Sequence, residues 1–255
     1  MAILNKARPN TGVDNIFLSA KAILCCGEDW QELLTALASS TTEKPTLHHE
    51  YRCYRFSKFT DFTLIWSPMG TGCLEPLLYE LHEASIIETI VLIGTAGATS
   101  TEKVKLGELY IGEEAFLGAT AVKLSSDMAS FRPEFSKDSL AQIDLKPASI
   151  ASTDYYYGFS RNKSSQGLRS ADQDLETAVA TLFDKVDLVD METAQFYYFC
   201  QALFHHGSLS YVSLKGAANF LAGQALQTTH SLEILRKAIA ASFLLLRVQA
   251  QTLTS

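Results

Sequence analysis

The sequence predicts a single α/β domain in which helices flank a mainly parallel or mixed central sheet in three layers. Continuous apolar runs typical of buried parallel strands occur at residues 22–26 and 90–93. Segments with helical spacing of leucines alternate with these runs, as expected for a covered sheet. The chain has 255 residues and neither a linker-like change in composition nor an internal repeat, so residues 1–255 are interpreted as one domain.

The elements follow in order along the chain. We expect a loose lead-in over residues 1–15 and then a buried strand that a Gly27-Glu28-Asp29 turn converts into a helix. Further strands are expected near residues 51–56, 62–66, 90–93, 106–111, 148–152, 188–190 and 211–219. Helices are expected after the glycine turn at 70–72, from Ser170 to Phe183, over 192–204 and over 232–253, and residues 124–147 are expected to be rich in loops. The helix over 192–204 is apolar nearly all round, which predicts burial.

Charge and composition exclude several classes of function. The net charge is −7 and the basic residues are scattered, which argues against nucleic acid as a partner. The odd number of cysteines, five, indicates reduced thiols and a cytoplasmic protein. No Cys-x-x-Cys occurs, so we expect no metal site. No apolar run is long enough to span a membrane.

Two strand ends bring chemically useful side chains together. One strand delivers Asp190, Met191 and Glu192 to the start of a helix, and a later strand runs through Lys215 to Asn219. Ligands of open α/β sheets bind at the carboxyl ends of strands. A thioether beside a carboxylate suits a sugar, because sulfur packs on its apolar face and the carboxylate accepts its hydroxyl groups.

The segment Asp190-Met191-Glu192-Thr193-Ala194 resembles the Met-Glu signature of the nucleoside phosphorylase and nucleosidase superfamily. Three further motifs occur in the same order as in that family. These are a glycine turn at 69–72, the loop Gly94-Thr95-Ala96-Gly97 and a strand start at 105–108. The resemblance implies a nucleoside phosphorylase-like fold, a small-molecule nucleoside as substrate and no cofactor.

The resemblance also implies roles for individual residues. Met191 and Glu192 would bind the ribose, and the Glu192 carboxylate would stabilise the cationic sugar that forms as the glycosidic bond breaks. Thr95 would take the place of a serine beside the ribose or water, within the loop that includes Ala96 and Gly97.

The base would be held by other residues. Tyr156, with Tyr155 before it, occupies the place of a family aromatic that stacks on the base, although a run of three tyrosines also fits ordinary packing. The family's aspartate that protonates the purine falls on Asn219 if a short insertion precedes the strand, and on Lys215 otherwise. An asparagine can read adenine but cannot supply a proton, so the proton would come through water or Lys215.

Two features favour hydrolysis over phosphorolysis. Leu92 stands where phosphorylases of the family carry an arginine, and their Gly-Asp-Pro-x-Arg phosphate loop is missing. A phosphate dianion needs such donors. The hydrolytic branch uses a glutamate after the first strand to activate water, and either Glu28 or Asp29 fills that place; both also suit the start of a helix.

The sequence therefore predicts a cytoplasmic nucleosidase similar to the methylthioadenosine/S-adenosylhomocysteine and aminodeoxyfutalosine nucleosidases, the last of which implies menaquinone biosynthesis. It would release adenine from a nucleoside with a modified 5′ group. By resemblance we expect a homodimer. A phosphate-dependent phosphorylase of purine or uridine type and a non-catalytic nucleoside binder are the alternatives.

Overall fold

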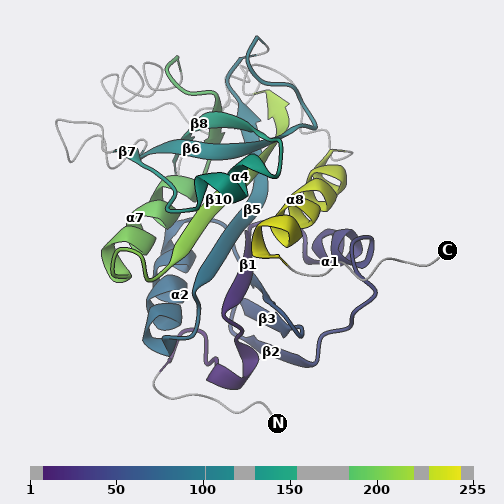
Figure 1. Ribbon diagram of the computed structural model, residues 1–255, viewed down its shortest axis with the longest axis vertical. Coiled ribbons are helices and arrows are strands. Elements are labelled where there is room, and N and C mark those ends of the chain that lie inside the picture. Colours follow the sequence, from purple (N-terminus) through teal and green to yellow (C-terminus); the bar gives the residue numbers. More distant parts are fainter. Residues whose placement is uncertain (1–7, 101, 118–129, 154–183, 221–229, 248–255) are drawn as a thin grey trace, which may run out of the picture.

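A computed structural model describes residues 8–100, 102–117, 130–153, 184–220 and 230–247. The described strands form one mixed sheet with helices on both faces, and this confirms the expected fold class (Figure 1). The strands are β1 (Lys21–Cys26), β2 (Leu47–Tyr51), β3 (Tyr54–Lys58), β4 (Thr63–Ser67), β5 (Thr89–Ala98), β6 (Leu109–Leu117), β7 (Ser130–Phe131), β8 (Lys146–Ser152), β9 (Leu188–Asp190) and β10 (Ser210–Phe220). The helices are η1 (Asn15–Phe17), α1 (Trp30–Ala38), α2 (Thr71–Ala84), α4 (Lys137–Ala141), α7 (Thr193–Leu203) and α8 (Ser231–Leu246).

Strand β5 is the centre of the sheet. It pairs in parallel with β1 and with β10, so the three strands end at the same edge. On the far side of β1 the sheet continues through β4, β3 and β2. Four residues of β5, from Ile90 to Ile93, are fully buried, as their continuous apolar run predicts for a central parallel strand.

The other half of the sheet closes into a ring of five strands. Strand β10 pairs with both β5 and β6, β6 pairs with β8, β8 pairs with β9, and β9 returns to β5. A separate apolar cluster that includes Tyr110, Ile150 and Leu188 is drawn from all five of these strands. Closure of the ring lays β9 antiparallel to the last residues of β5, with Val189 opposite Gly97, and brings Asp190 at the end of β9 beside Lys215 of β10.

Two helices cover each face of the sheet. Figure 1 shows α2 and α7 on one side, and α1 and α8 on the other. The apolar side chains of each pair belong to a separate core cluster, one containing Leu77 and Phe196, the other Leu33 and Ile239. Burial of these two apolar stripes fixes where each helix begins, and thereby places the loops that precede α1, α2 and α7 at one edge of the sheet.

Several expected boundaries are wrong. The chain turns at Arg52, which has a φ of 51°, so residues 51–56 contain the β2–β3 hairpin instead of a single strand. Strand β6 begins only at Leu109, because Gly107 adopts a φ of 77° and interrupts the expected strand at 106–111. Helix α7 is not buried all round, since Tyr198 is 44% exposed. The expected helix from Ser170 to Phe183 lies outside the described residues.

The described part of the N-terminal segment is packed, which corrects the expectation of a loose lead-in for residues 8–15. Glu80 on α2 is buried and accepts hydrogen bonds from the backbone and side chains of Asn10 and Thr11, at 2.6–2.8 Å. Arg8 and Val13 are also buried. A buried carboxylate that receives four hydrogen bonds fixes this segment against α2. Among the described residues, no helix has the length and apolar character to cross a membrane.

Candidate active site

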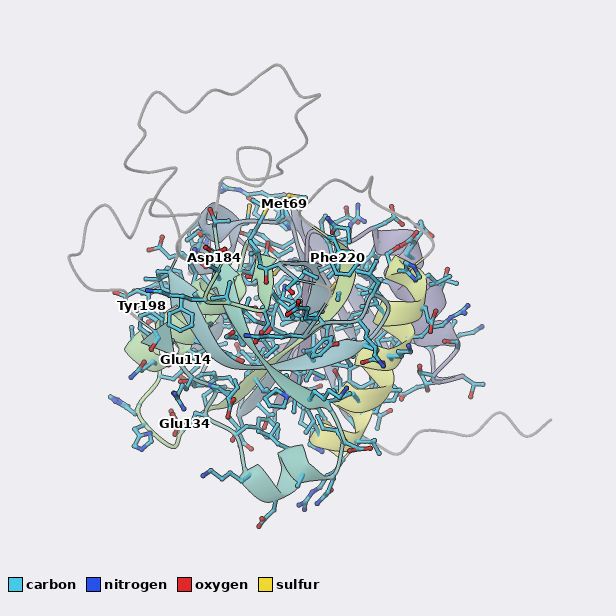
Figure 2. All side chains as sticks on the ribbon, turned by 90° about the horizontal axis from the view of Figure 1, so that it is seen from above. Met69, Glu114, Glu134, Asp184, Tyr198 and Phe220 are labelled. Carbon is cyan, nitrogen blue, oxygen red and sulfur yellow. The ribbon has the colours of Figure 1, made fainter. Side chains whose placement is uncertain are left out.

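The candidate site lies beside the ends of β1 and β9, at the level of Gly94 on β5 and Lys215 on β10. Glu28 follows β1, Thr95 lies on β5, Glu192 follows β9, and Lys215 on β10 is paired in register with Gly94 of β5. Figure 2 shows the molecule from above, with Met69, just before α2, and Phe220, at the end of β10, among the labelled residues. This is the edge at which open α/β sheets bind their ligands.

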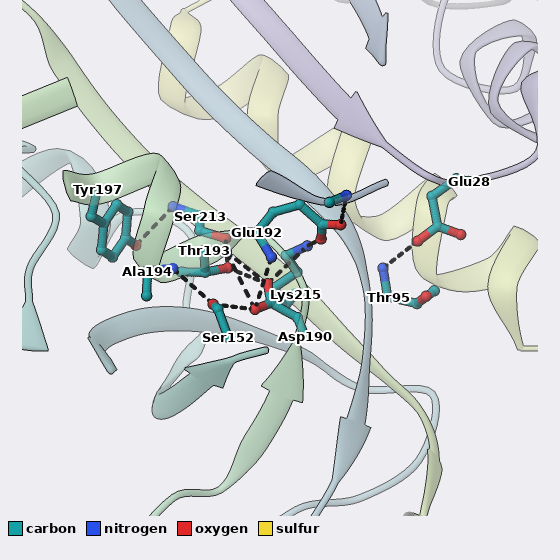
Figure 3. A network of polar contacts seen from close by, with 11 residues as sticks. Glu28, Thr95, Ser152, Asp190, Glu192, Thr193, Ala194, Tyr197, Ser213 and Lys215 are labelled. Atoms are coloured by element: carbon teal, nitrogen blue, oxygen red, sulfur yellow. Dashed lines mark hydrogen bonds and ion pairs between the residues drawn. The ribbon is translucent and has the colours of Figure 1, made fainter. Parts of the chain in front are cut away.

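Glu28 reaches across from β1 to β5. Its side chain is half-buried, and Oε1 accepts a hydrogen bond from the backbone N–H of Thr95 at 2.5 Å (Figure 3). A Cβ added to Gly94 would lie 3.2 Å from Glu28 Oε1 and 3.3 Å from Lys215 Nζ. The absence of a side chain at Gly94 therefore leaves a small space bordered by a carboxylate and an ammonium group.

Lys215 is held between two carboxylates. Its Nζ lies 3.0 Å from Asp190 Oδ2 and 3.2 Å from Glu192 Oε2, and its side chain is 1% exposed. Burial acts to lower the pKa of Lys215, but the charges of Asp190 and Glu192 outweigh it and the pKa is raised. Lys215 is therefore a fixed positive charge and a poor proton donor.

Glu192 is held at both oxygens. Oε1 accepts a hydrogen bond from the backbone N–H of Gly70 at 3.0 Å, and Oε2 is paired with Lys215. Burial raises the pKa of Glu192, Lys215 acts to lower it and Asp190 acts to raise it, and the pKa is raised overall. The Gly70 contact joins the start of α2 to the start of α7, so two loops distant in sequence set the position of this carboxylate.

A buried polar network supports Asp190 (Figure 3). Asp190 accepts hydrogen bonds from the hydroxyl groups of Ser152 and Thr193. Thr193 Oγ1 lies 2.9 Å from Ser213 Oγ, and the backbone N–H of Ser213 donates to the hydroxyl of Tyr197 at 2.9 Å. Tyr197 in turn donates to the carbonyl oxygen of Gly112 at 2.6 Å. The network ties β8, α7, β10 and β6 together behind the ion pair.

The remaining predicted site residues are distributed unevenly around this centre. Asp29 is exposed and accepts from the backbone N–H groups of Gln31 and Glu32, so it caps α1. Ala96 and Gly97 are buried on β5, and Met191 is half-buried before Glu192. Asn219 is 9% exposed and pairs with Gly97 after a β-bulge in β10. Tyr155 and Tyr156 lie outside the described residues.

Several contacts of the candidate site were not predicted from the sequence. Nothing in the pattern of residues 69–72 indicates that the Gly70 N–H would bind Glu192, because the two lie far apart in the chain. The signal for the supporting network was present, since Ser152 and Ser213 are polar residues within apolar strands. Such residues require buried partners. The described residues contain no group of three or more histidine, cysteine or acidic side chains arranged for a metal ion.

The family model described as the phosphorylase superfamily matches residues 22–248. The chain belongs to this superfamily. The resemblance read from the Met-Glu segment and the glycine loops is thereby confirmed at the level of the superfamily. Among curated protein sequences, none matches this chain.

Solved structures of the same fold include both hydrolases and phosphorylases. The MTA/SAH nucleosidase of Streptococcus pneumoniae is 16% identical, with a TM-score of 0.61 over 90% of this chain and 100% of its own. A futalosine hydrolase mutant of Helicobacter pylori is 14% identical, with a TM-score of 0.63 over 90% and 100%. Uridine phosphorylase of Vibrio fischeri is 20% identical, with a TM-score of 0.66 over 94% and 97%.

The likeness to these solved structures establishes the fold, and the class of ligand comes from membership of the superfamily. The superfamily consists of nucleoside-processing enzymes, so a small-molecule nucleoside is the substrate that membership implies. Nucleosidases and phosphorylases match at comparable levels. The choice between water and phosphate as nucleophile therefore depends on the charges at the site.

Proposed function

We propose that this protein is a nucleosidase that hydrolyses the N-glycosidic bond of adenine-type nucleosides with a modified 5′ group and releases adenine. The observation that carries the proposal is the charge around Gly94. Three carboxylates, those of Glu28, Asp190 and Glu192, face one ammonium group, and that group is already paired with two of them. This balance favours a cationic sugar and disfavours a phosphate dianion.

In the proposed mechanism Glu28 is the general base. Its carboxylate borders the space over Gly94, where a water molecule would lose a proton to it and attack the anomeric carbon. Asp29 is less suited to this role, because its side chain accepts hydrogen bonds from the backbone N–H groups of Gln31 and Glu32 and so holds the first turn of α1. Thr95 lies next to Glu28 and would contact the same water or the ribose.

Glu192 and Met191 would bind the ribose. The negative charge of Glu192, fixed by Lys215 and Gly70, would stabilise the oxocarbenium-like sugar as the bond to the base breaks. Ala96 and Gly97 would line the floor of the site from β5. This arrangement requires no metal or organic cofactor.

Asn219, Tyr155 and Tyr156 would hold the base. The Asn219 amide would donate to N7 and accept from the exocyclic amine of adenine. It supplies no proton, and Lys215 is held as a cation, so the leaving adenine would be protonated through water. Since general-acid help is worth about 10²–10⁴-fold, slow turnover is part of the proposal.

The test is adenine release from methylthioadenosine, S-adenosylhomocysteine and aminodeoxyfutalosine, each with and without phosphate. We expect phosphate-independent release that is lost in Glu28→Gln and retained in Asp29→Asn, because asparagine preserves the helix cap. Release that requires phosphate would replace this proposal with a phosphorylase, a class to which the Vibrio fischeri structure belongs. Ligand-induced stabilisation without any base release would indicate a nucleoside binder.

Two further expectations belong to the same proposal. We expect a cytoplasmic homodimer, as in the hydrolytic branch that the sequence resembles. Sedimentation of the purified protein and fractionation of cells that produce it are the direct measurements. A monomer that hydrolyses its substrate would contradict the dimer and leave the reaction unchanged.

A further inference from the structure

The turn that carries Glu28 is held from the adjacent strand β4. Glu28 belongs to neither β1, which ends at Cys26, nor α1, which begins at Trp30. The backbone N–H of Gly27 donates to Ser67 O at 2.9 Å, and the indole N–H of Trp66 donates to the backbone carbonyl oxygen of Glu28 at 2.8 Å. The second contact fixes the peptide plane from which the Glu28 side chain departs.

Trp66 is itself held by a cation and a second indole. The guanidinium carbon of Arg55 lies 5.1 Å from the ring of Trp66 and 5.4 Å from the ring of Trp30. The two indoles meet edge to face at 6.4 Å. Arg55 is opposite Trp66 in the β3–β4 register and is paired with Glu50 at 3.1 Å. Cation–π contacts of this kind restrict the ring that donates to Glu28.

The inner side of the same turn faces the candidate site. Glu28 Oε1 accepts from Thr95 N at 2.5 Å and lies beside the space over Gly94. The backbone of Glu28 is therefore held by Trp66, while its side chain faces the candidate site. A displacement of a reacting group by about 1 Å can cost about 10²-fold in rate.

We infer that Trp66 is a positioning residue for Glu28, and that its indole N–H sets the place of the carboxylate that activates water. The inference rests on the proposed function, in which Glu28 is the general base. Trp66 acts through the Glu28 backbone and contacts neither substrate nor water. Trp30 and Arg55 support the ring of Trp66.

The test is a double-mutant cycle on kcat. Trp66→Phe removes the N–H and keeps an aromatic ring, so we expect kcat to fall by about 10- to 100-fold with KM changed by less than about twofold. In a Glu28→Gln background the same substitution should have no further effect on the residual rate, because the group that it positions is absent. Equal losses of kcat in both backgrounds would overturn the inference and leave the proposed function standing.

Two other variants guard against a general loss of structure. Trp30→Phe is the matched control, since no hydrogen bond of its indole N–H is found among the described residues, and we expect a smaller loss of kcat than in Trp66→Phe. Arg55→Met keeps the indole N–H and removes only the cation, so an intermediate loss that also vanishes in Glu28→Gln supports the inference even if Trp66→Phe does not fold. Unchanged kcat in Arg55→Met together with an unfolded Trp66→Phe would assign Trp66 to stability alone. A wild-type protein that releases no base would overturn the proposed function and this role with it.

Discussion

Lys215 Nζ lies 3.0 Å from Asp190 Oδ2, and each of the two side chains is 1% exposed. The pair joins β10 to the end of β9, and through Glu192 it reaches the start of α2. A buried cation shared by two carboxylates fixes the charge of the site before any ligand arrives.

Lys215→Met should strongly destabilise the fold. The substitution leaves Asp190 and Glu192 buried without their cation, and removal of one partner of a buried pair costs about 3–5 kcal/mol. Because the pKa of Lys215 is raised, the stabilisation is fully present at neutral pH and is lost only as the pH rises through that raised value.

Urea denaturation at pH 7 measures the effect on the free energy of unfolding. Lys103→Met is the control, because Lys103 is 69% exposed and its ion pair with Asp187 is worth less than about 1 kcal/mol. Similar losses of unfolding free energy in the two variants would show that the buried cation stabilises the fold no more than an exposed one does.

Gly94→Ala should reduce activity while leaving the fold intact. The added methyl group would lie 3.2 Å from Glu28 Oε1 and 3.3 Å from Lys215 Nζ, in the space assigned to the attacking water. We expect kcat to fall by about 10²-fold, as for a misplaced reacting group.

Steady-state adenine release and thermal unfolding of both variants separate activity from stability. Gly72→Ala is the matched control, because a Cβ there meets nothing within 4 Å and alanine favours helix α2. Full activity in Gly94→Ala would show that the attacking water does not occupy the position over Gly94.

The acid limb of the pH–rate profile should reflect Glu192. Burial raises the pKa of this carboxyl group, so its ionised form is lost at a higher pH than that of an ordinary glutamate, near 4.3. As the pH falls, kcat/KM should therefore decline before that value is reached. Glu192→Gln should lower kcat throughout and lack this limb, whereas residual activity in Glu28→Gln should retain it. A wild-type profile that stays flat down to about pH 4 contradicts the assignment.

Tyr197→Phe should destabilise the protein by about 1–3 kcal/mol, because it leaves the Ser213 N–H and the Gly112 carbonyl group buried without their partner. Tyr198→Phe on the same helix is the control, since Tyr198 is 44% exposed and its loss should change little. Chemical denaturation of the two variants gives the comparison. Equal stabilities would mean that the network behind Asp190 does not support the fold.

By itself, the sequence determined the layered α/β fold and the family. Apolar runs such as 90–93 predict buried strands, and the Met-Glu segment and the glycine loops occur along the chain in the order of the family. These signals are local, so spacing alone carries them. The same locality explains the wrong boundaries at residues 51–56 and 106–111, where backbone turns at Arg52 and Gly107 leave only weak marks in the sequence.

Only the tertiary structure decided how the candidate site is assembled. It separated Glu28, which faces Thr95, from its neighbour Asp29, which caps a helix. It also placed Lys215 between Asp190 and Glu192, a pairing that depends on the closure of five strands into a ring. Contacts between residues far apart in the chain are set by packing of whole elements, and no short motif records them.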